Sequence, residues 1–287
     1  MQEFLRFFLN GLAEDLNRQR LGPQPGGGSK GAGMSSIGQV ATTIGDEALA
    51  KLPADQQATR AWTLHLARND SEVTSMFCGQ LQSRIFCLTC GNVSYCFDPF
   101  FDLSVPLASS TAACTLEGCL QAFTKEETLD GENRPICSGC RKRRKSEKSL
   151  SIHRFPPVLV IHLKRFQYDS SSREKIETAV DFPISGLDLS PYSTAGAFLS
   201  SSQAAQGQLC RLYGVCNHTG GLEGGHYTAH CRHNVPSQGG SNPSPRDGGD
   251  WYTFDDARVS TVNPARIGGS AAYVLFYRLM QRGDHYG

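Results

Sequence analysis

The chain has 287 residues, of which 39% are hydrophobic and 19% are charged, and its formal net charge is +1. This composition is typical of a globular protein with a substantial core, and the balanced charge argues against a surface dedicated to nucleic acid. No apolar run approaches about 18 residues, and the first residues lack a basic segment and a cleavage site, so neither a membrane span nor a signal peptide is expected.

Helices are predicted in the first quarter of the chain. Apolar residues recur over residues 4–16 at the spacing of an amphipathic helix, and such a stripe is expected to pack against another element. Residues 21–49, which begin with a stretch rich in glycine, proline and serine, form a predicted flexible insert. A second helix is predicted over residues 52–66, and Asp70-Ser71-Glu72 would cap a short helix that ends at Met76.

Strands dominate the rest of the chain. Residues 158–163 form the strongest predicted strand, and its continuous apolar run suggests burial on both faces. The other predicted elements are strands over 85–87, 92–97, 212–217, 227–232 and 272–277, a helix over 116–123, and polar loops over 170–173 and 236–249. Helices early and strands late favour an α+β fold with segregated layers.

Four cysteines form two CxxC pairs, Cys87 with Cys90 and Cys137 with Cys140, separated by a long stretch of chain. Two thiolates spaced in this way in each of two tight turns complete a tetrahedral sulfur site that suits Zn²⁺. The separation places the turns on two separate hairpins. Because four protein ligands leave no position for water, the predicted role of the metal is structural. Four free buried cysteines, or a redox pair, are the alternatives.

The remaining cysteines have no paired spacing, and each is interpreted as a small buried apolar residue. Without a secretory signal, the eleven cysteines favour reduced thiols and a location in the cytoplasm or the nucleus. The seven cysteines outside the CxxC pairs are Cys78, Cys96, Cys114, Cys119, Cys210, Cys216 and Cys231.

A candidate catalytic pair lies late in the chain. His226 follows two glycines and opens a predicted strand, a pattern that by itself favours an ordinary strand histidine. A later strand ends in Asp255-Asp256, and antiparallel pairing of the two strands would place an acid beside the imidazole. Such an acid fixes the histidine tautomer and stabilises the imidazolium formed in nucleophilic catalysis. One of the two acids is expected to be a turn residue.

Several motifs in chain order resemble the catalytic domain of the ubiquitin-specific proteases. They are Gln2-Glu3-Phe4-Leu5, Gly79-Gln80-Leu81, the two CxxC pairs, His162-Leu163-Lys164-Arg165-Phe166, Gly224-Gly225-His226-Tyr227-Thr228-Ala229, Asp255-Asp256 and Tyr273-Val274-Leu275-Phe276-Tyr277. The resemblance covers residues 1–20 and 50–279. It implies a papain-like cysteine protease fold with thumb, palm and fingers and a zinc-ribbon-like site in the fingers.

The domain organisation implied by the resemblance is one protease domain over residues 1–279 with a tail over 280–287. Within it, residues 1–20 would be a remnant helix of a mostly missing thumb, 80–150 the zinc-binding fingers and 151–279 the palm. The implied partners are ubiquitin and ubiquitinated proteins, with structural Zn²⁺ as the cofactor.

The implied activity is thiol-dependent hydrolysis of the isopeptide bond after the C-terminal glycine of ubiquitin. His226 would be the general base, Asp255 the orienting acid and Asp256 its polar neighbour, while residues 219–225 would form a mobile loop over the ubiquitin tail. The residues expected to contact ubiquitin are Gln2, Glu3, Gly79, Gln80, Leu81, Gly224, Gly225 and Tyr227.

One departure from the family pattern concerns the nucleophile. Family members carry a Gly-Asn-Thr-Cys-type box before the Gln-Glu-Phe motif, whereas Met1 stands directly before Gln2 here, and the first cysteine is Cys78. A base without a thiol has no proton to remove, so the chain is expected to be an N-terminally incomplete protease that is inactive as it stands. With most of the thumb missing, part of the apolar stripe over residues 4–16 is expected to lack packing partners.

Two readings from other classes stay open. A catalytically dead ubiquitin-binding scaffold would explain the missing thiol. A zinc-ribbon adaptor for nucleic acid would use the basic run at residues 141–145 beside the second CxxC pair, although a solvated finger tip is the favoured interpretation of that run. Neither a membrane nor a nucleic acid is an expected partner.

Overall fold

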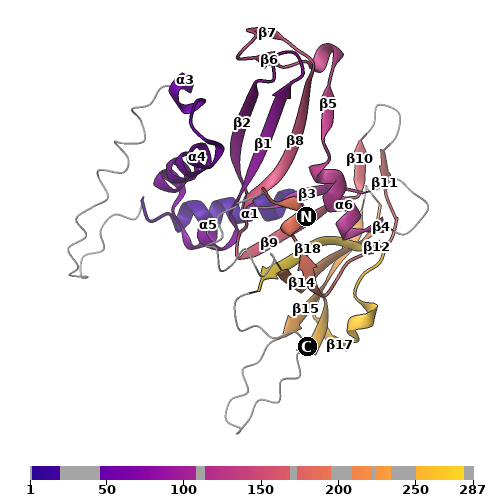
Figure 1. Ribbon diagram of the computed structural model, residues 1–287. Helices are drawn as coiled ribbons and strands as arrows, with labels where there is room; N and C mark the ends of the chain where they lie inside the picture. Colours follow the sequence, from indigo (N-terminus) through magenta and orange to yellow (C-terminus); the bar gives the residue numbers. More distant parts are fainter. Residues whose placement is uncertain are drawn as a thin grey trace, which may run out of the picture. The chain divides into compact units, whose positions relative to one another are not determined.

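The computed structural model describes residues 2–19, 46–107, 114–168, 173–194, 209–221, 224–233 and 250–280 (Figure 1). Several predicted features therefore lie outside the described residues: Met1, residues 21–45 of the insert, most of the polar loop at 170–173, the loop at 236–249, and residues 281–287 of the tail. None of the described helices is long and apolar enough to cross a membrane.

The described residues divide into two compact units that alternate along the sequence. Unit 1 comprises residues 1–101, 124–156 and 192–198, and unit 2 comprises residues 102–123, 157–191 and 199–287. Residues 102–123 belong to unit 2 because β3 (Leu103–Pro106) pairs in parallel with β9 (Val158–Lys164) of that unit.

Unit 1 is built on a four-stranded antiparallel sheet with the order β2-β1-β8-β5. Its long strands run side by side, and the small β6–β7 hairpin lies at their far end (Figure 1). The strands are β1 (Gly79–Cys87), β2 (Val93–Phe100), β5 (Glu127–Leu129), β6 (Ile136–Cys137), β7 (Lys142–Arg143) and β8 (Ser146–Arg154).

Three helices of unit 1 confirm predicted helical segments: α1 (Gln2–Asp15), α4 (Ala54–Asn69) and α5 (Glu72–Phe77). A further helix, α3 (Asp46–Leu49), was not predicted. The predicted cap is also confirmed, because the Ser71 hydroxyl accepts a hydrogen bond of 3.0 Å from the backbone N–H of Thr74. Helix α3 lies inside the predicted insert, so the insert ends before Asp46.

The apolar stripe of α1 is only partly covered. Leu9 is buried, but the side chains of Phe4, Phe8 and Leu16 are exposed, which agrees with the expectation that part of the stripe lacks packing partners in this chain. The helix is instead anchored at its C-terminal end. There Asn17 donates to the carbonyl of Arg68 at 2.7 Å.

Unit 2 contains the sheet that carries the candidate catalytic residues. Its strand order is β17-β16-β15-β14-β18-β9-β3, with β13 paired to β14, and all pairings but β3–β9 are antiparallel. The further strands are β13 (Ser185–Asp188), β14 (Leu209–Gly220), β15 (Gly225–His233), β16 (Asp250–Asp255), β17 (Arg258–Val262) and β18 (Ala272–Leu279).

Smaller elements complete unit 2. They are α6 (Leu116–Thr124), the parallel pair β4 (Cys114–Thr115) and β12 (Val180–Asp181), and the hairpin of β10 (Phe166–Tyr168) with β11 (Arg173–Lys175). Strand β9 is buried along residues 158–163 between β18 and β3, which confirms the prediction of burial on both faces. The overall fold is α+β, as the sequence predicted.

A buried arginine closes the end of β9. Arg165 has no exposed surface, and its guanidinium donates only to backbone carbonyls among the contacts described. The acceptors are Ala272 at 2.6 Å, Thr178 at 2.8 Å, Ile176 at 2.9 Å and Gly269 at 3.2 Å. One side chain therefore satisfies carbonyls from β18 and from two connecting segments, and it ties these segments to the end of β9.

Candidate active site and metal centre

The tight hairpin of β14 and β15 positions His226. Thr219 lies opposite His226 in the register, and Gly220 lies opposite Gly225. Gly220 has a φ of 101°, a conformation that favours glycine. At Gly225, a Cβ atom would lie 2.2 Å from the Nε2 atom of His218, so only glycine fits.

The hairpin also shortens the loop expected over residues 219–225. Strand β14 continues to Gly220 and β15 begins at Gly225, so the connection is confined to residues 221–224, of which 222 and 223 lie outside the described part of the chain. The backbone on both sides of the turn is therefore paired, and His226 stands on a strand rather than on a loop.

His226 and Asp255 meet across neighbouring strands. Strands β15 and β16 are antiparallel, with Ala229 opposite Phe254, so Asp255 lies at the end of β16 that faces the start of β15. The Nε2 atom of His226 is 2.5 Å from an Oδ1 atom of Asp255, a short charge-assisted contact. The pairing proposed from the sequence therefore brings these two residues together.

This contact determines what the imidazole can do. Asp255 accepts from Nε2, so the proton of the neutral ring resides on Nε2 and the lone pair on Nδ1. The hydrogen bond to Asp255 raises the pKa of His226 above its ordinary value, although both side chains remain about half exposed at 49% and 46%. The arrangement suits a base that accepts a proton at Nδ1 and is stabilised when charged.

The His226 pKa gives a direct test. Replacing Asp255 with asparagine should return the pKa toward about 6.5, because an amide does not stabilise the imidazolium. In an NMR titration of the imidazole resonances, Asp256→Asn is the matched control and should lower the pKa less, since Asp256 contributes only a weaker charge effect. An equal or larger drop in the control would contradict the assignment of Asp255.

The sign of the linked stability follows from the raised pKa. The charged pair stabilises the fold fully below the unfolded pKa, about 6.5, and this contribution is lost as the pH rises through the folded value. Because both groups are half exposed, water and salt screen the effect.

Asp256 occupies the turn between β16 and β17, as expected for one of the two acids. Its φ is 49°, in the left-handed region, and Asp255 pairs with Arg258 across the turn. One ligand atom from each of His226, Asp255 and Asp256 lies within 4.8 Å of the others. Asp256 therefore adds negative potential next to the imidazole without replacing Asp255 as its partner.

Lys175 is a residue of the site that sequence reasoning did not identify. Its Nζ donates to the backbone carbonyls of His218 at 2.9 Å and Gly220 at 2.8 Å. These carbonyls end the strand that precedes His226, so the ammonium holds the hairpin in place. A lone lysine in a polar segment carries no sequence signal for this role.

The residues expected to contact ubiquitin differ in their surroundings. Gln80 is buried and donates to the carbonyl of Ala58 at 3.0 Å, so its side chain supports α4 instead of offering a surface. Gly79 allows the ring of Phe100 to approach closely, since a Cβ there would lie 2.4 Å from it. The others are exposed or half-buried: Gln2, Glu3, Leu81, Gly224, Gly225 and Tyr227.

The cysteine quartet converges at the end of the unit 1 sheet. One sulfur from each of Cys87, Cys90, Cys137 and Cys140 lies within 4.8 Å of the others, and the Cys90 and Cys137 sulfurs are 3.6 Å apart. Tetrahedral Zn–S bonds of about 2.3 Å separate sulfurs by about 3.8 Å. The spacing and the donor set therefore fit Zn²⁺.

The two turns that carry the sulfurs are built alike. The N–H of Gly91 donates to the Cys87 carbonyl at 2.9 Å, and the N–H of Arg141 donates to the Cys137 carbonyl at 2.7 Å. Gly91 and Arg141 both have positive φ, at 71° and 53°. The turns lie on the β1–β2 and β6–β7 hairpins, which confirms the expectation of two separate hairpins.

The thiols of the quartet do not titrate alike. The backbone N–H of Cys90 lowers the pKa of Cys87 to about 6. The N–H of Asn92 lowers the pKa of Cys90, but the sulfur of Cys140, burial and the other sulfurs outweigh it and raise that pKa to about 12. Four adjacent thiolates repel one another, so a cation is needed to hold them all deprotonated.

A cysteine–histidine pair in unit 1 is unsuited to catalysis. The Cys78 sulfur lies 3.6 Å from Nε2 of His65. Burial raises the pKa of Cys78 to about 12 and lowers the pKa of His65, which favours the neutral pair over a thiolate. The interpretation of Cys78 as a buried residue is confirmed, whereas Cys96 is exposed and the same prediction was wrong there.

Solved structures similar to this chain include SAGA DUB modules. A SAGA DUB module, Ubp8/Sgf11/Sus1/Sgf73 bound to ubiquitin aldehyde, has 28% identity and a TM-score of 0.59, and the match covers 79% of this chain and 47% of that chain. A yeast SAGA DUB module with a mutant Sgf73 has 28% identity and a TM-score of 0.61, covering 85% and 49%. The fold is therefore that of a deubiquitinase catalytic domain.

Sequence comparison narrows the class to a family. The model of the ubiquitin carboxyl-terminal hydrolases matches residues 1–277, and the chain belongs to that family. It is 38% identical over 279 residues to ubiquitin carboxyl-terminal hydrolase 2 of Homo sapiens and 35% identical over 291 residues to ubiquitin carboxyl-terminal hydrolase 21 of Mus musculus. These matches cover 97% and 98% of the chain but 40% and 46% of the relatives.

Proposed function

We propose that this chain is the larger part of a deubiquitinase catalytic domain, in which His226 and Asp255 catalyse hydrolysis of the bond after the C-terminal glycine of ubiquitin. The observation that carries the proposal is the 2.5 Å contact between His226 Nε2 and Asp255, which leaves Nδ1 available as a base. Membership of the family and the similarity to modules bound to ubiquitin support the substrate.

In the proposed reaction, Nδ1 of His226 removes the proton of a cysteine thiol, and the thiolate attacks the carbonyl carbon of the terminal glycine. The imidazolium, stabilised by Asp255, then donates that proton to the leaving amine as the carbon–nitrogen bond breaks. Water attacks the resulting thioester with His226 again as base, which releases the ubiquitin carboxylate and restores the thiol.

We propose that none of the described cysteines of unit 2 supplies the thiol for this step. In unit 2, burial raises the pKa of Cys210 to about 12 and that of Cys216 to about 11, and it also raises the pKa of Cys231. Thiols of this kind remain protonated near neutral pH. We therefore propose that residues 1–287 alone bind ubiquitin without hydrolysing it.

Turnover of a fluorogenic ubiquitin substrate tests the role of His226 in hydrolysis, and calorimetry tests ubiquitin binding. The purified chain should show no more activity than its His226→Ala variant, while calorimetry should still detect ubiquitin binding. A chimera with the family's Gly-Asn-Thr-Cys-type box fused ahead of Gln2 should gain activity that His226→Ala abolishes. A chimera with equal activity in both forms would refute the role of His226, and absent ubiquitin binding would refute the substrate.

We further propose that the cysteine quartet binds Zn²⁺ and that the metal is structural. Four sulfur ligands would leave no open coordination position for catalysis. The reduced cysteines fit the cytoplasm or the nucleus, where thiols persist.

A further inference from the structure

Two buried thiols of unit 2 lie in contact where β4 meets α6. The sulfur atoms of Cys114, on β4, and Cys119, on α6, are 3.3 Å apart. Cys114 is 6% exposed and Cys119 is 1% exposed. The sulfur of Cys114 also donates to the carbonyl of Thr115 at 3.6 Å. This dithiol is separate from the cysteine quartet, which belongs to unit 1, and the proposed hydrolysis makes no use of it.

The contact between the two sulfurs is close to what a disulfide requires. Bonded sulfurs are about 2.05 Å apart, so the sulfurs of Cys114 and Cys119 need to approach by about 1.2 Å. The two cysteines are five positions apart in the sequence. A thiol that is oxidised at one position therefore has a second thiol within reach.

A buried cation lies near the pair. Burial lowers the pKa of Arg165, whereas negative charge on Cys119 or Cys114 raises it, so both sulfurs lie within electrostatic reach of the guanidinium. A positive charge beside a thiol stabilises the thiolate, which is the form that attacks an oxidant. The arginine that closes the end of β9 therefore also acts on the dithiol.

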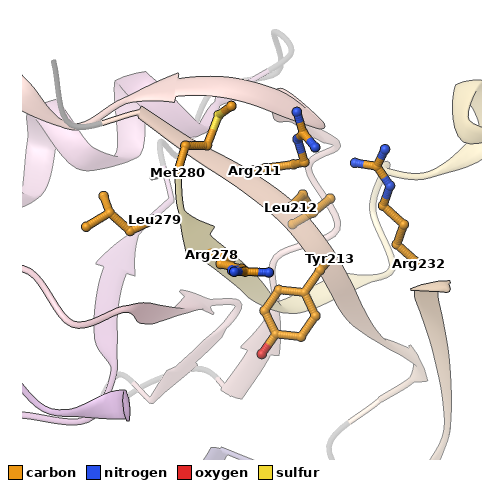
Figure 2. A pocket seen from close by; sticks show the side chains of 7 residues that line it. All are labelled: Arg211, Leu212, Tyr213, Arg232, Arg278, Leu279 and Met280. Atoms are coloured by element: carbon orange, nitrogen blue, oxygen red, sulfur yellow. The ribbon is translucent and has the colours of Figure 1, made fainter. Parts of the chain in front are cut away.

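Access to the thiols depends on β4. Strand β4 has two residues and forms a two-stranded sheet with β12, which also has two (Figure 1), so this pairing is weak and can open locally. A small cavity of about 100 Å³ in unit 2 does not lead to the pair, because its walls come from β14, β15 and β18 (Figure 2). Cys114 is therefore expected to meet an oxidant before Cys119 does.

We propose that Cys114 and Cys119 form a disulfide when the chain meets a peroxide. The Cys114 thiolate attacks one oxygen of hydrogen peroxide, the oxygen–oxygen bond breaks, and the hydroxide that leaves takes up the thiol proton as water. The Cys119 thiolate then attacks the resulting sulfenic acid at sulfur, and the sulfur–oxygen bond breaks with loss of a second water. Two thiols and one peroxide thus give a disulfide and two waters.

The disulfide ties β4 to α6 and constrains the segment that pairs with β4. The N–H of Cys114 donates to the carbonyl of Ala179 at 3.2 Å, and Val180 lies opposite Cys114 in the β4–β12 register. The carbonyl of Thr178 in the same segment accepts from Arg165 at 2.8 Å. Oxidation is therefore expected to make the pairing of β4 with β12 more persistent. The proposal does not depend on the catalytic role of His226.

Peptide mapping of the intact chain after treatment with hydrogen peroxide tests whether the disulfide forms. Cleavage after Phe101 and Lys125 releases a fragment in which Cys114 and Cys119 are the two cysteines. This fragment should lose the mass of two hydrogen atoms, and dithiothreitol should restore it. Cys119→Ser should prevent the loss and leave Cys114 as a sulfenic acid that dimedone labels.

Cys210→Ser is the matched control for the mapping experiment. Cys210 is also 1% exposed and lies in unit 2, but it has no contact with another sulfur among the contacts described. The Cys210→Ser chain should form the disulfide between Cys114 and Cys119 at the same peroxide concentration as the unaltered chain.

Hydrogen exchange measured by NMR tests whether the disulfide constrains β4. The amides of Cys114 and Val180 should exchange more slowly in the oxidised chain and should return to the original rate after reduction. Peroxide treatment of Cys119→Ser should not slow the exchange of either amide.

Three outcomes on the unaltered chain would overturn the proposal, whether or not Cys119→Ser folds. They are thiols that both stay reduced when the exposed Cys96 is fully oxidised, a disulfide that joins either cysteine to a different sulfur, and unchanged exchange at Cys114 and Val180 after the disulfide has formed. The first would show that burial protects the pair, and the third that the disulfide does not constrain β4.

Discussion

Replacing Cys137 with serine is expected to unfold the metal-binding end of unit 1. Binding of Zn²⁺ to structural sites contributes about 10–16 kcal/mol in small zinc domains, which is comparable to the whole stability of a domain. Strands β6 and β7 have two residues each and pair only with each other, so backbone pairing alone cannot maintain this hairpin. The tips of β1 and β2 should lose order with it.

Zinc content and fluorescence measure this effect. The unaltered chain should contain one zinc ion, and Cys137→Ser or a strong chelator should remove it. Trp62 in unit 1 and Trp251 in unit 2 are the two tryptophans of the chain. A Trp251→Phe background therefore leaves Trp62 in α4 as the reporter of unit 1.

Cys96→Ser is the matched control for the zinc experiment. Cys96 lies on β2 of the same unit but is exposed and outside the quartet. The Cys96→Ser protein should retain its zinc and should unfold at the same urea concentration as the unaltered chain. A Cys137→Ser protein that keeps full zinc content and unchanged stability would rule out the proposed metal centre.

Replacing Arg165 with methionine is expected to cost about 4 kcal/mol or more of unfolding free energy. The change removes the donor from the buried carbonyl of Ala272 and from three part-buried carbonyls, and each buried group left unsatisfied costs about 1–3 kcal/mol. Losses of this size are exceptional for a single substitution and approach the full stability of many domains. Arg165→Lys should be intermediate, because an ammonium reaches fewer of the carbonyls.

Urea unfolding followed by Trp251 fluorescence in a Trp62→Phe background measures the stability of unit 2, the unit that contains Arg165. Trp251 is 3% exposed, so its emission should shift strongly when unit 2 unfolds. The neighbouring Lys164 is exposed, and Lys164→Met should stay within about 0.5 kcal/mol. Similar unfolding midpoints for the two methionine variants would contradict the structural role of Arg165.

The sequence predicted much of the local structure because local patterns specify it. Apolar periodicity found α1 and α4, the continuous apolar run found β9, and Ser71 marked a cap. The doubled CxxC spacing similarly predicted that four sulfurs from distant parts of the sequence would lie together.

Features that depend on tertiary placement were harder to predict from the sequence. Nothing in the sequence near Lys175 shows that its ammonium reaches the carbonyls of His218 and Gly220. Gln80 resembles a family contact residue, yet the packing of α4 buries it. Arg165 was visible as part of a motif, but its four acceptors are separated from it by up to 107 residues.

For the same reason, periodicity could not show that Phe4 and Phe8 would remain exposed on α1, because it identifies an apolar face but not what covers it. The strand that carries His226 and its pairing with the strand that ends in Asp255 were both suggested by the sequence, whereas the register and the 2.5 Å contact are properties of the folded chain.

The alternation of the two units along the chain has a practical consequence for proteolysis and protein engineering. Because the polypeptide leaves unit 1 at residue 101, returns at 124 and leaves again at 156, no single cut separates one unit intact from the other. A premature stop after β8 would leave β3 without β9, its partner in the sheet of unit 2. Many native contacts therefore join distant stretches of sequence, a topology associated with slow folding. Added domains are better inserted at surface loops than exchanged for a terminal half of the chain.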